Sequence, residues 1–274
     1  MNNITTIGID LAKNVFQLHG VDKEGKAMLT KRVSRGNLLK AMRELAPCLV
    51  GLEACGSAHY WARQISALGH TVKIMAPQHV KPYIGNAKND YKDAIGICEA
   101  VGRAKMLFVP VKSEGQQDIQ SLHRVRSRLV ETRTALVNQI RGLLAEYGII
   151  FPKGIRHIRN KLLDVAEDAE NILSMDMRTM LQDLYDELIM LDAKIKRYNT
   201  KLEELFKTDE TCQRLGQVEG IGLLTATAMV AAVGHAKEFK NGRQMAAWLG
   251  LTPRQHSSGE KFRLGSIIKQ GNTA

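Results

Sequence analysis

The first 110 residues alternate short apolar segments with polar turns. Short runs of β-branched and other apolar residues predict strands, and apolar residues spaced three or four positions apart predict helices. The predicted strands are residues 3–9, 15–21, 27–33, 48–52 and 71–75, and the predicted helices are residues 36–45, 60–68 and 90–103. Three strands followed by alternating helices and strands predict an α/β N-terminal domain, with a mixed sheet and helices on both faces.

Beyond this domain the apolar pattern becomes helical over much longer distances. Residues 117–147 predict one long helix, residues from about 171 to 206 predict a second, and a Phe-Pro-Lys-Gly sequence at 151–154 separates them. The second helix carries an unbroken heptad seam: Leu181, Leu184, Leu188, Leu191, Ile195, Tyr198, Leu202 and Leu205. We therefore expect a long coiled-coil hairpin that pairs between subunits of a homo-oligomer. The alternative is a hairpin whose seam is buried within one chain.

The last part of the chain begins with an apolar-glycine pattern between two helical segments. Gly220 and Gly222 precede an apolar helix at residues 223–233, an arrangement typical of a helix-hairpin-helix element. We expect the backbone N–H groups of this turn to contact phosphate, although an ordinary turn between helices has the same pattern. A short helix at 244–249 and a polar, basic loop at 250–263 follow, which predicts a small, mainly α C-terminal domain.

These changes of pattern divide the chain into three predicted domains. They are residues 1–110, 111–208 and 209–274. Divided at residues 110 and 215, the chain carries 15 basic and 8 acidic residues in its first part, 17 and 17 in its middle, and 7 and 3 in its last part. The formal net charge of +11 therefore lies at the two ends, which favours DNA or another polyanion as the partner. The alternative is that the charge serves solubility alone.

The cysteines and the N-terminus predict a cellular compartment. Four cysteines stand at positions 48, 55, 98 and 212, a spacing that matches neither a zinc motif nor a disulfide framework. The N-terminus is polar, and no apolar run approaches the length of a membrane span. We expect a cytoplasmic protein with reduced thiols.

Four acidic residues of the first part stand where they could share a metal ion. Asp10 ends the first predicted strand, Glu53 follows the fourth, and Asp90 and Asp93 lie one turn apart at the start of a helix. Carboxylate oxygens are suitable ligands for Mg²⁺, and two such ions can stabilise the attacking and leaving oxygens of phosphodiester chemistry. The alternatives are a turn residue for Asp10 and a favourable helix-dipole charge for Asp90.

Two adjacent serines in the basic loop are candidate nucleophiles. Ser257 and Ser258 lie among cationic residues that could hold phosphate oxygens, and His256 could accept a proton. The cationic residues are Arg254, Lys261 and Arg263. On the residues alone, a solvated turn is the better interpretation of a Ser-Ser-Gly sequence.

Five of these segments together resemble one family. The sequences IGIDLAK at 7–13, LEACG at 52–56 and KNDYKDA at 88–94 resemble the three DEDD motifs of the bridge-RNA-guided insertion-sequence transposases. The segments at 218–222 and 250–259 resemble the C-terminal transposase domain of that family. The similarity extends over nearly the whole chain.

This resemblance implies a function and a set of site residues. It implies an RNase H-like domain of the Holliday-junction-resolvase type, a coiled-coil connector and a serine-bearing domain. The metal-binding carboxylates would be Asp10, Glu53, Asp90 and Asp93, with Mg²⁺ as cofactor. The nucleophile would be Ser258, directly before the glycine, rather than Ser257. It further implies recombination of the DNA at the element ends and target through a covalent serine–DNA intermediate. The resemblance also implies a non-coding guide RNA as a partner and an active site to which different protomers contribute residues.

Two features depart from the family pattern. Members usually continue past the position of Asn272, so we expect a fragment or a truncated copy of uncertain activity. Glu260 follows Gly259 at a position where small or polar residues are frequent. Three other functions stay open: a metal-dependent junction endonuclease without serine chemistry, an inactive nucleic-acid-binding remnant, and an actin-like or sugar-kinase-like phosphotransferase. The last would need a second glycine-rich phosphate loop, and the sequence offers none.

Overall fold

A computed structural model describes residues 4–84, 89–234, 236, 239–259, 261–268 and 271. The chain forms two compact units. The first contains residues 1–113 and 235–244, and the second contains residues 114–234 and 245–274. Lys88, Glu260 and Asn272, which the sequence analysis singled out, lie outside the described residues. The division into three domains stays a prediction.

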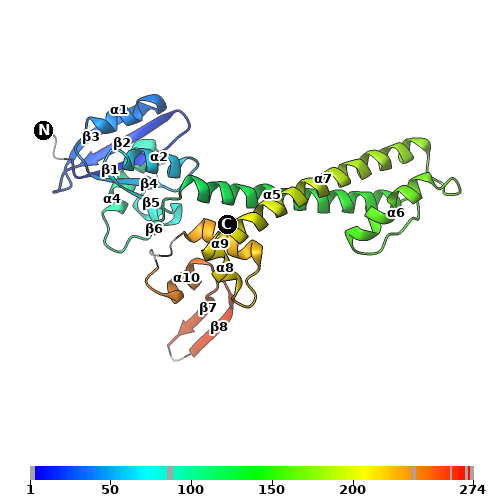
Figure 1. Ribbon diagram of the computed structural model, residues 1–274. Helices are drawn as coiled ribbons and strands as arrows, with labels where there is room; N and C mark the ends of the chain where they lie inside the picture. The colour runs from blue at the N-terminus through cyan, green and yellow to red at the C-terminus, as the bar shows by residue number, and fades with distance from the viewer. Residues whose placement is uncertain are drawn as a thin grey trace. The chain divides into compact units, whose positions relative to one another are not determined.

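Within the described residues, six strands of the first unit form one mixed sheet in the order β3-β2-β1-β4-β5-β6 (Figure 1). The strands are β1 (Thr6–Asp10), β2 (Val15–Val21), β3 (Ala27–Ser34), β4 (Leu49–Glu53), β5 (Thr71–Met75) and β6 (Phe108–Val109). β1 pairs antiparallel with β2 and parallel with β4, and β4 pairs parallel with β5. The predicted mixed α/β sheet is therefore confirmed, with β6 as an additional antiparallel edge strand.

Helices cover both faces of this sheet. The helical segments are η1 (Arg35–Asn37), α1 (Leu38–Arg43), α2 (Ala58–Ser66), α3 (Pro77–Val80), η2 (Lys81–Tyr83) and α4 (Asp90–Val101). Ile7 and Ile9 of β1 pack in one core with α1 and α2, and that core includes Met42 and Ile65. Gly8 lies between these isoleucines and points to the opposite face, where α4 packs.

Two glycines let α4 approach the sheet closely. A Cβ atom at Gly8 would lie 2.2 Å from the carbonyl oxygen of Ala94 and 2.4 Å from the nitrogen of Cys98. Gly8 is paired in register with Gly51 of β4, where a Cβ atom would lie 2.8 Å from Cβ of Val101. The backbone of α4 thus contacts the backbone of β1, which only glycine allows.

Long helices dominate the second unit. They are α5 (Glu114–Ala145), α6 (Ile155–Glu167) and α7 (Met175–Thr208), and Figure 1 shows α5 and α7 running alongside each other. Their shared core contains Leu136 and Ile140 of α5, Leu162 of α6 and Leu188 of α7. The two predicted long helices are present, whereas α6 was not expected between them.

The predicted heptad seam is buried inside this chain. Five of its residues are buried, namely Leu181, Leu188, Leu191, Ile195 and Leu202. The other three, Leu184, Tyr198 and Leu205, are partly buried. The seam therefore has intramolecular partners in α5 and α6, and pairing between subunits, like the coiled coil itself, stays a prediction.

The last part contains α8 (Glu210–Gly216), α9 (Leu223–Val233), α10 (Gly242–Trp248), β7 (Pro253–Ser258) and β8 (Lys261–Ile267). The expected loop at 250–263 is wrong, because β7 and β8 pair as an antiparallel hairpin. All residues of both strands are exposed, so no buried face imposed an alternating apolar pattern that would have predicted them. No helix in the described parts of the chain is long and apolar enough to cross a membrane.

Candidate metal centre and serine hairpin

Two carboxylates lie at the same edge of the central sheet. Asp10 is the last residue of β1 and Glu53 is the last residue of β4. The parallel register pairs Ile9 with Leu52, so the next residue of each strand is one of these acids. The carboxyl ends of adjacent parallel strands meet at one edge, which brings Asp10 and Glu53 to neighbouring positions as predicted.

The other two carboxylates come from the first turn of α4. Asn89 caps this helix, because its Oδ1 accepts a hydrogen bond of 3.0 Å from the N–H of Tyr91. Asp90 and Asp93 follow within that turn. Carboxylate oxygens of Asp10, Asp90 and Asp93 all lie within 4.8 Å of one another, so the sheet edge and the helix start form one acidic cluster.

The electrostatics show how crowded this cluster is. The pKa of Asp10 is raised from 3.8 to about 6, mainly by burial and then, in decreasing order, by the charges of Asp93, Asp90 and Glu53. Burial and the charge of Asp93 also raise the pKa of Glu53. Glu53 is therefore close enough to interact with the cluster, although it lies outside the group defined by 4.8 Å.

These residues fit a divalent metal ion. All three residues grouped within 4.8 Å offer carboxylate oxygens, which favours a hard cation. After burial, the negative charges of Asp93, Asp90 and Glu53 contribute to the raised pKa of Asp10, so the carboxylates repel one another. A divalent ion would compensate these charges.

Sequence reasoning missed the residues that position this cluster. Gly8 and Gly51 allow α4 to approach, and Asn89 fixes where α4 begins. Cys55 was expected only as a reduced thiol, but burial and the charges of Glu53 and Asp10 raise its pKa, which places it beside the acids. Its position two residues after Glu53 was the available signal. All four cysteines are free thiols.

The hairpin places the two serines on opposite faces. Ser258 is paired with Lys261 and His256 with Arg263, whereas Ser257 is paired with Phe262. Because side chains alternate along a strand, Ser258 shares its face with His256, Lys261 and Arg263. The Oγ of Ser257 accepts a hydrogen bond of 2.9 Å from Nε2 of Gln255 on the other face. Arg254, also in β7, lies at the shift in pairing register between Pro253 and Gln255.

The glycine turn joins α8 to α9 as expected for two helices and a short connection. Gly220 has a φ of +84°, a conformation that favours glycine, and Gly222 is the N-cap of α9. Both glycines are exposed. Their contact with phosphate stays a prediction.

Fold and site first define a class: an α/β protein whose sheet edge carries carboxylates suited to a divalent metal ion. Comparison with known proteins then gives the family. Residues 7–149 match the DEDD transposase family of IS110, and residues 212–274 match the family described as transposase IS116/IS110/IS902.

Relatives are similar along almost the entire chain. It is 50% identical to a probable family 20 transposase of Pseudomonas aeruginosa over 99% of this chain and 80% of the relative. It is 44% identical to the transposase for insertion sequence element IS1111A of Coxiella burnetii, covering 99% of this chain and 75% of the relative. It is 41% identical to the transposase for IS1328 of Yersinia enterocolitica, covering 99% and 80%. The chain belongs to the IS116/IS110/IS902 family of insertion-sequence transposases.

Proposed function

We propose that this protein recombines DNA at an insertion sequence through Mg²⁺-bound carboxylates and a serine nucleophile. The observation that supports this most is the convergence of Asp10, Asp90 and Asp93 within 4.8 Å, in a chain of a transposase family. Glu53 completes the DEDD set from the adjacent strand. Transposases act on DNA, so the scissile phosphodiester is the substrate of this site.

Asp10, Glu53, Asp90 and Asp93 would hold Mg²⁺ in an RNase H-like domain. Bound there, Mg²⁺ supplies charge compensation for the phosphate oxygens at the reacting centre. The carboxylates fix its place, since Asp10 and Glu53 are attached to neighbouring strands and Asp90 and Asp93 to one helical turn.

Ser258 is the proposed nucleophile. Its Oγ forms a bond to phosphorus as the bond between phosphorus and the leaving deoxyribose oxygen breaks. The serine proton passes to His256 on the same face, and the leaving oxygen takes a proton from solvent. Lys261 and Arg263 on that face would hold the phosphate oxygens, with Arg254 in the same strand as Ser258. Ser257 lies on the opposite face with Phe262, which supports Ser258 as the better candidate.

The family resemblance supports three further parts of the proposal. A guide RNA would select the DNA, and the basic ends of the chain would bind both nucleic acids with strong salt dependence. Gly220 and Gly222 would contact a phosphate of the backbone. Carboxylates and serine would come from different protomers of a homo-oligomer.

A nicked suicide DNA substrate tests the serine. We expect the unmodified protein to form a covalent protein–DNA adduct that survives denaturing electrophoresis, and Ser258→Ala to lose the adduct while retaining DNA binding. Ser257→Ala is the matched control and should retain the adduct. An adduct that persists with Ser258→Ala contradicts the assignment, and free cut ends without any adduct favour a junction endonuclease that uses water.

A further inference from the structure

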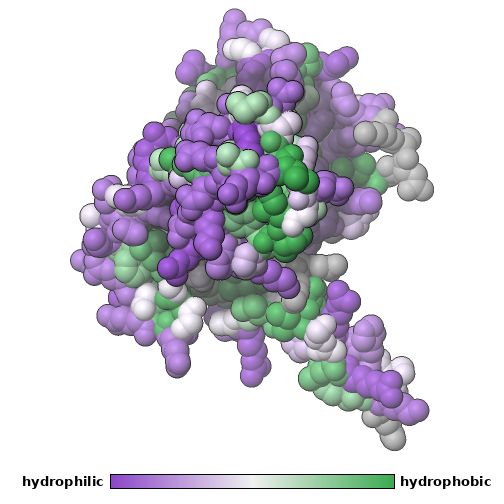
Figure 2. Space-filling model, turned by 90° about the vertical axis from the view of Figure 1, so that its right-hand side faces the viewer, coloured by the Kyte–Doolittle hydropathy of each residue, from purple (hydrophilic) through white to green (hydrophobic). Residues whose placement is uncertain are grey.

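The outer face of helix α6 carries a basic half and an acidic half. The inner face packs on α5 and α7, where Ile158 and Leu162 are fully buried. Figure 2 looks onto the end of the unit that carries α6, and hydrophilic side chains cover most of the surface that faces the viewer. The exposed basic residues are Lys153, just before the helix, and Arg156, His157 and Lys161, whereas Asp164 and Glu167 are the exposed acids near its end.

This order of charges opposes the helix dipole. The N-terminal end of a helix favours acidic side chains, and the C-terminal end favours basic ones. The first turn of α6 has no acidic residue, and its last turn has no basic residue. Helix α7 of the same unit has the favourable order, with Asp176 in its first turn and Lys207 in its last. The charges of α6 therefore do not stabilise the helix, which indicates that they serve a contact outside it.

The basic half lacks acidic partners among the described residues. The sequence from Lys153 to Lys161 contains no acidic residue. The described ion pairs include none for Lys153, Arg156 or Lys161, and none for Asp164, which lies one turn beyond Lys161. This half of α6 therefore presents uncompensated positive charge at the surface.

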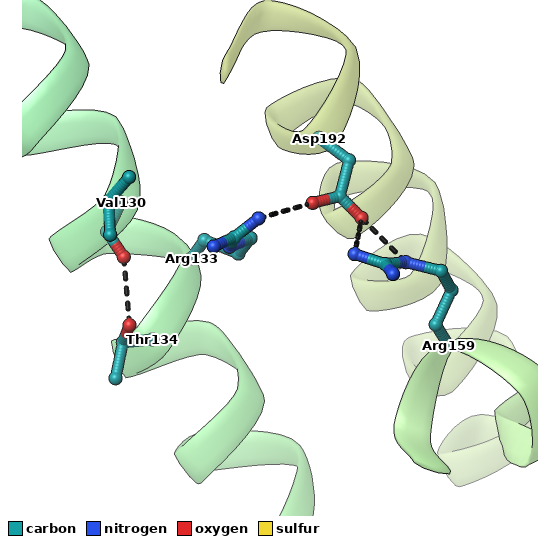
Figure 3. Close-up of polar contacts among 5 residues, drawn as sticks. All are labelled: Val130, Arg133, Thr134, Arg159 and Asp192. Carbon is teal, nitrogen blue, oxygen red and sulfur yellow. Dashed lines mark hydrogen bonds and ion pairs between the residues drawn. The ribbon is translucent and has the colours of Figure 1, made fainter. Parts of the chain in front are cut away.

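An arginine on the inner side of the same half adds to this charge. Nε of Arg159 donates a hydrogen bond of 2.8 Å to Oδ2 of Asp192 in α7, and Nη1 of Arg133 in α5 donates one of 2.8 Å to Oδ1 (Figure 3). A guanidinium stays charged in proteins, so two of them with one carboxylate leave one positive charge in excess. The same contacts tie α6 to the two long helices.

The segment that leads into α6 is also held in place. Nη2 of Arg141 in α5 donates to the carbonyl oxygens of Pro152 and Gly154, at 3.1 and 2.8 Å. These two residues flank Lys153, so the backbone on either side of this lysine is fixed to α5. The basic half of α6 is thus a rigid surface, on which only the exposed side chains must be ordered when a partner binds.

We propose that the basic half of α6 binds the phosphate backbone of duplex DNA. This inference rests on DNA as the substrate in the proposed function, and it places a DNA contact in the middle of the chain. The middle has 17 basic and 17 acidic residues, so its total charge did not predict one. Duplex DNA carries about one negative charge per 1.7 Å of its axis, which complements a compact group of cations. Asp164 and Glu167 repel the same backbone and restrict the contact to the first half of the helix.

The salt dependence of DNA binding by the full chain tests this surface. The test variant combines Lys153→Gln, Arg156→Gln and Lys161→Gln. The control combines Lys196→Gln, Arg197→Gln and Lys207→Gln, which remove the same kinds of exposed charge from α7. Fluorescence anisotropy of a labelled duplex DNA measures the binding constant over a series of salt concentrations.

We expect the test variant to bind at least about tenfold more weakly than the control at about 0.1 M salt. The slope of log K against log salt should become shallower by about 2 to 3, because each lost phosphate contact removes about 0.9. The thermal stability of the test variant should be retained, since its charges oppose the helix dipole. Where the triple variant fails to fold, Arg156→Gln against Arg197→Gln carries the test, with a slope difference of about 1.

Four results overturn the proposal. They are an equal loss in both variants, an unchanged salt slope, a loss of binding to single-stranded RNA but not to duplex DNA, and a lower mass in light scattering with unaltered DNA binding, which would make this face an interface between copies of the chain. The adduct test of Ser258 is separate. DNA binding that depends on α6 without any adduct contradicts the serine chemistry alone, whereas an unmodified chain that binds no duplex DNA contradicts both.

Discussion

The acidic cluster and the serine hairpin, the two parts of the proposed active site, differ in how firmly the fold holds them. The cluster rests on a close-packed framework, where α4 contacts β1 backbone to backbone at Gly8. The hairpin β7–β8 has exposed residues throughout, including Phe262 at 66% exposure. Isolated two-stranded hairpins are marginally stable. The carboxylates are thus preorganised by the fold, whereas the serine and its cations are available to be ordered by a bound partner.

We expect the largest effect from Gly8→Ala, which disturbs the packing that positions the acidic cluster. The new Cβ would overlap backbone atoms of α4, so the helix must move away from β1 and carry Asp90 and Asp93 with it. We expect a loss of about 3 kcal/mol in the free energy of unfolding, measured with urea, and loss of Mn²⁺ binding by calorimetry. Gly36→Ala is the control, since a Cβ there meets nothing within 4 Å. Equal effects of the two substitutions would show that the close approach does not position the acids.

Metal binding gives a second test of preorganisation. At about 100 times its dissociation constant, free Mg²⁺ should stabilise the folded protein by about 2.7 kcal/mol, because only the folded chain assembles the cluster. Asp93→Asn should lose most of this stabilisation, and Glu44→Gln, which changes an exposed acid of the same unit, should keep it. Unfolding curves with and without Mg²⁺ measure both. Retention of the full effect by Asp93→Asn would remove that residue from the ligand set.

The pH dependence of the metal-free protein reports the crowding of charges. The pKa of Asp10 is about 6 in the folded state and 3.8 ordinarily, so the folded state binds this proton more tightly than the unfolded state. The stabilisation is fully present below about pH 4 and is lost as the pH rises through about 6. With solvent screening, we expect about 2 kcal/mol. Urea unfolding with a chelator at about pH 4 and about pH 7 measures the loss, which Asp10→Asn should abolish. If the free energy of unfolding of Asp10→Asn depends on pH as strongly as that of the unmodified protein, the pH dependence comes from other groups.

The hairpin should show the smallest effect. Phe262→Ser removes an exposed aromatic side chain, and we expect the free energy of unfolding to change by less than about 0.5 kcal/mol. Trp61→Ala is the contrasting control, because Trp61 is 4% exposed in the core beneath the sheet. A loss at Phe262 that approaches the loss at Trp61 would mean that the hairpin is packed against another surface, which would break the comparison.

The parts that sequence predicted well are those where burial imposes a pattern. The strands ending at Asp10 and Glu53 alternate or run apolar because both lie in the centre of the sheet, and strand order then places both acids at one edge. The heptad seam was predicted for the same reason, because most of its residues are buried and therefore apolar. The structure groups the carboxylates of Asp10, Asp90 and Asp93 within 4.8 Å of one another, and their role as metal ligands stays a prediction.

The parts that sequence did not predict lack such a constraint. The exposed hairpin has no buried face to reveal its strands. Helix α6 was overlooked among basic and polar residues, although Ile155, Ile158 and Leu162 have helical spacing. The carboxylate of Asp192 binds Arg133, which is 59 positions away, and Arg159, which is 33 positions away. No local sequence pattern predicts such contacts. The position of Glu53 just outside the group within 4.8 Å could not be predicted either, because strand register does not give side-chain distances.

The contact between α4 and β1 has a consequence for how tolerant this protein is to change. Main-chain atoms of Ala94 and Cys98 pack against the main chain at Gly8. The distance between α4 and β1 is therefore set by backbone atoms and not by side chains. Exchanging one apolar side chain for another in the surrounding interior would alter stability and leave that distance unaltered. Divergent copies of such a protein can therefore exchange many interior side chains and still keep the same spacing of acids, provided that the glycines at positions 8 and 51 are kept.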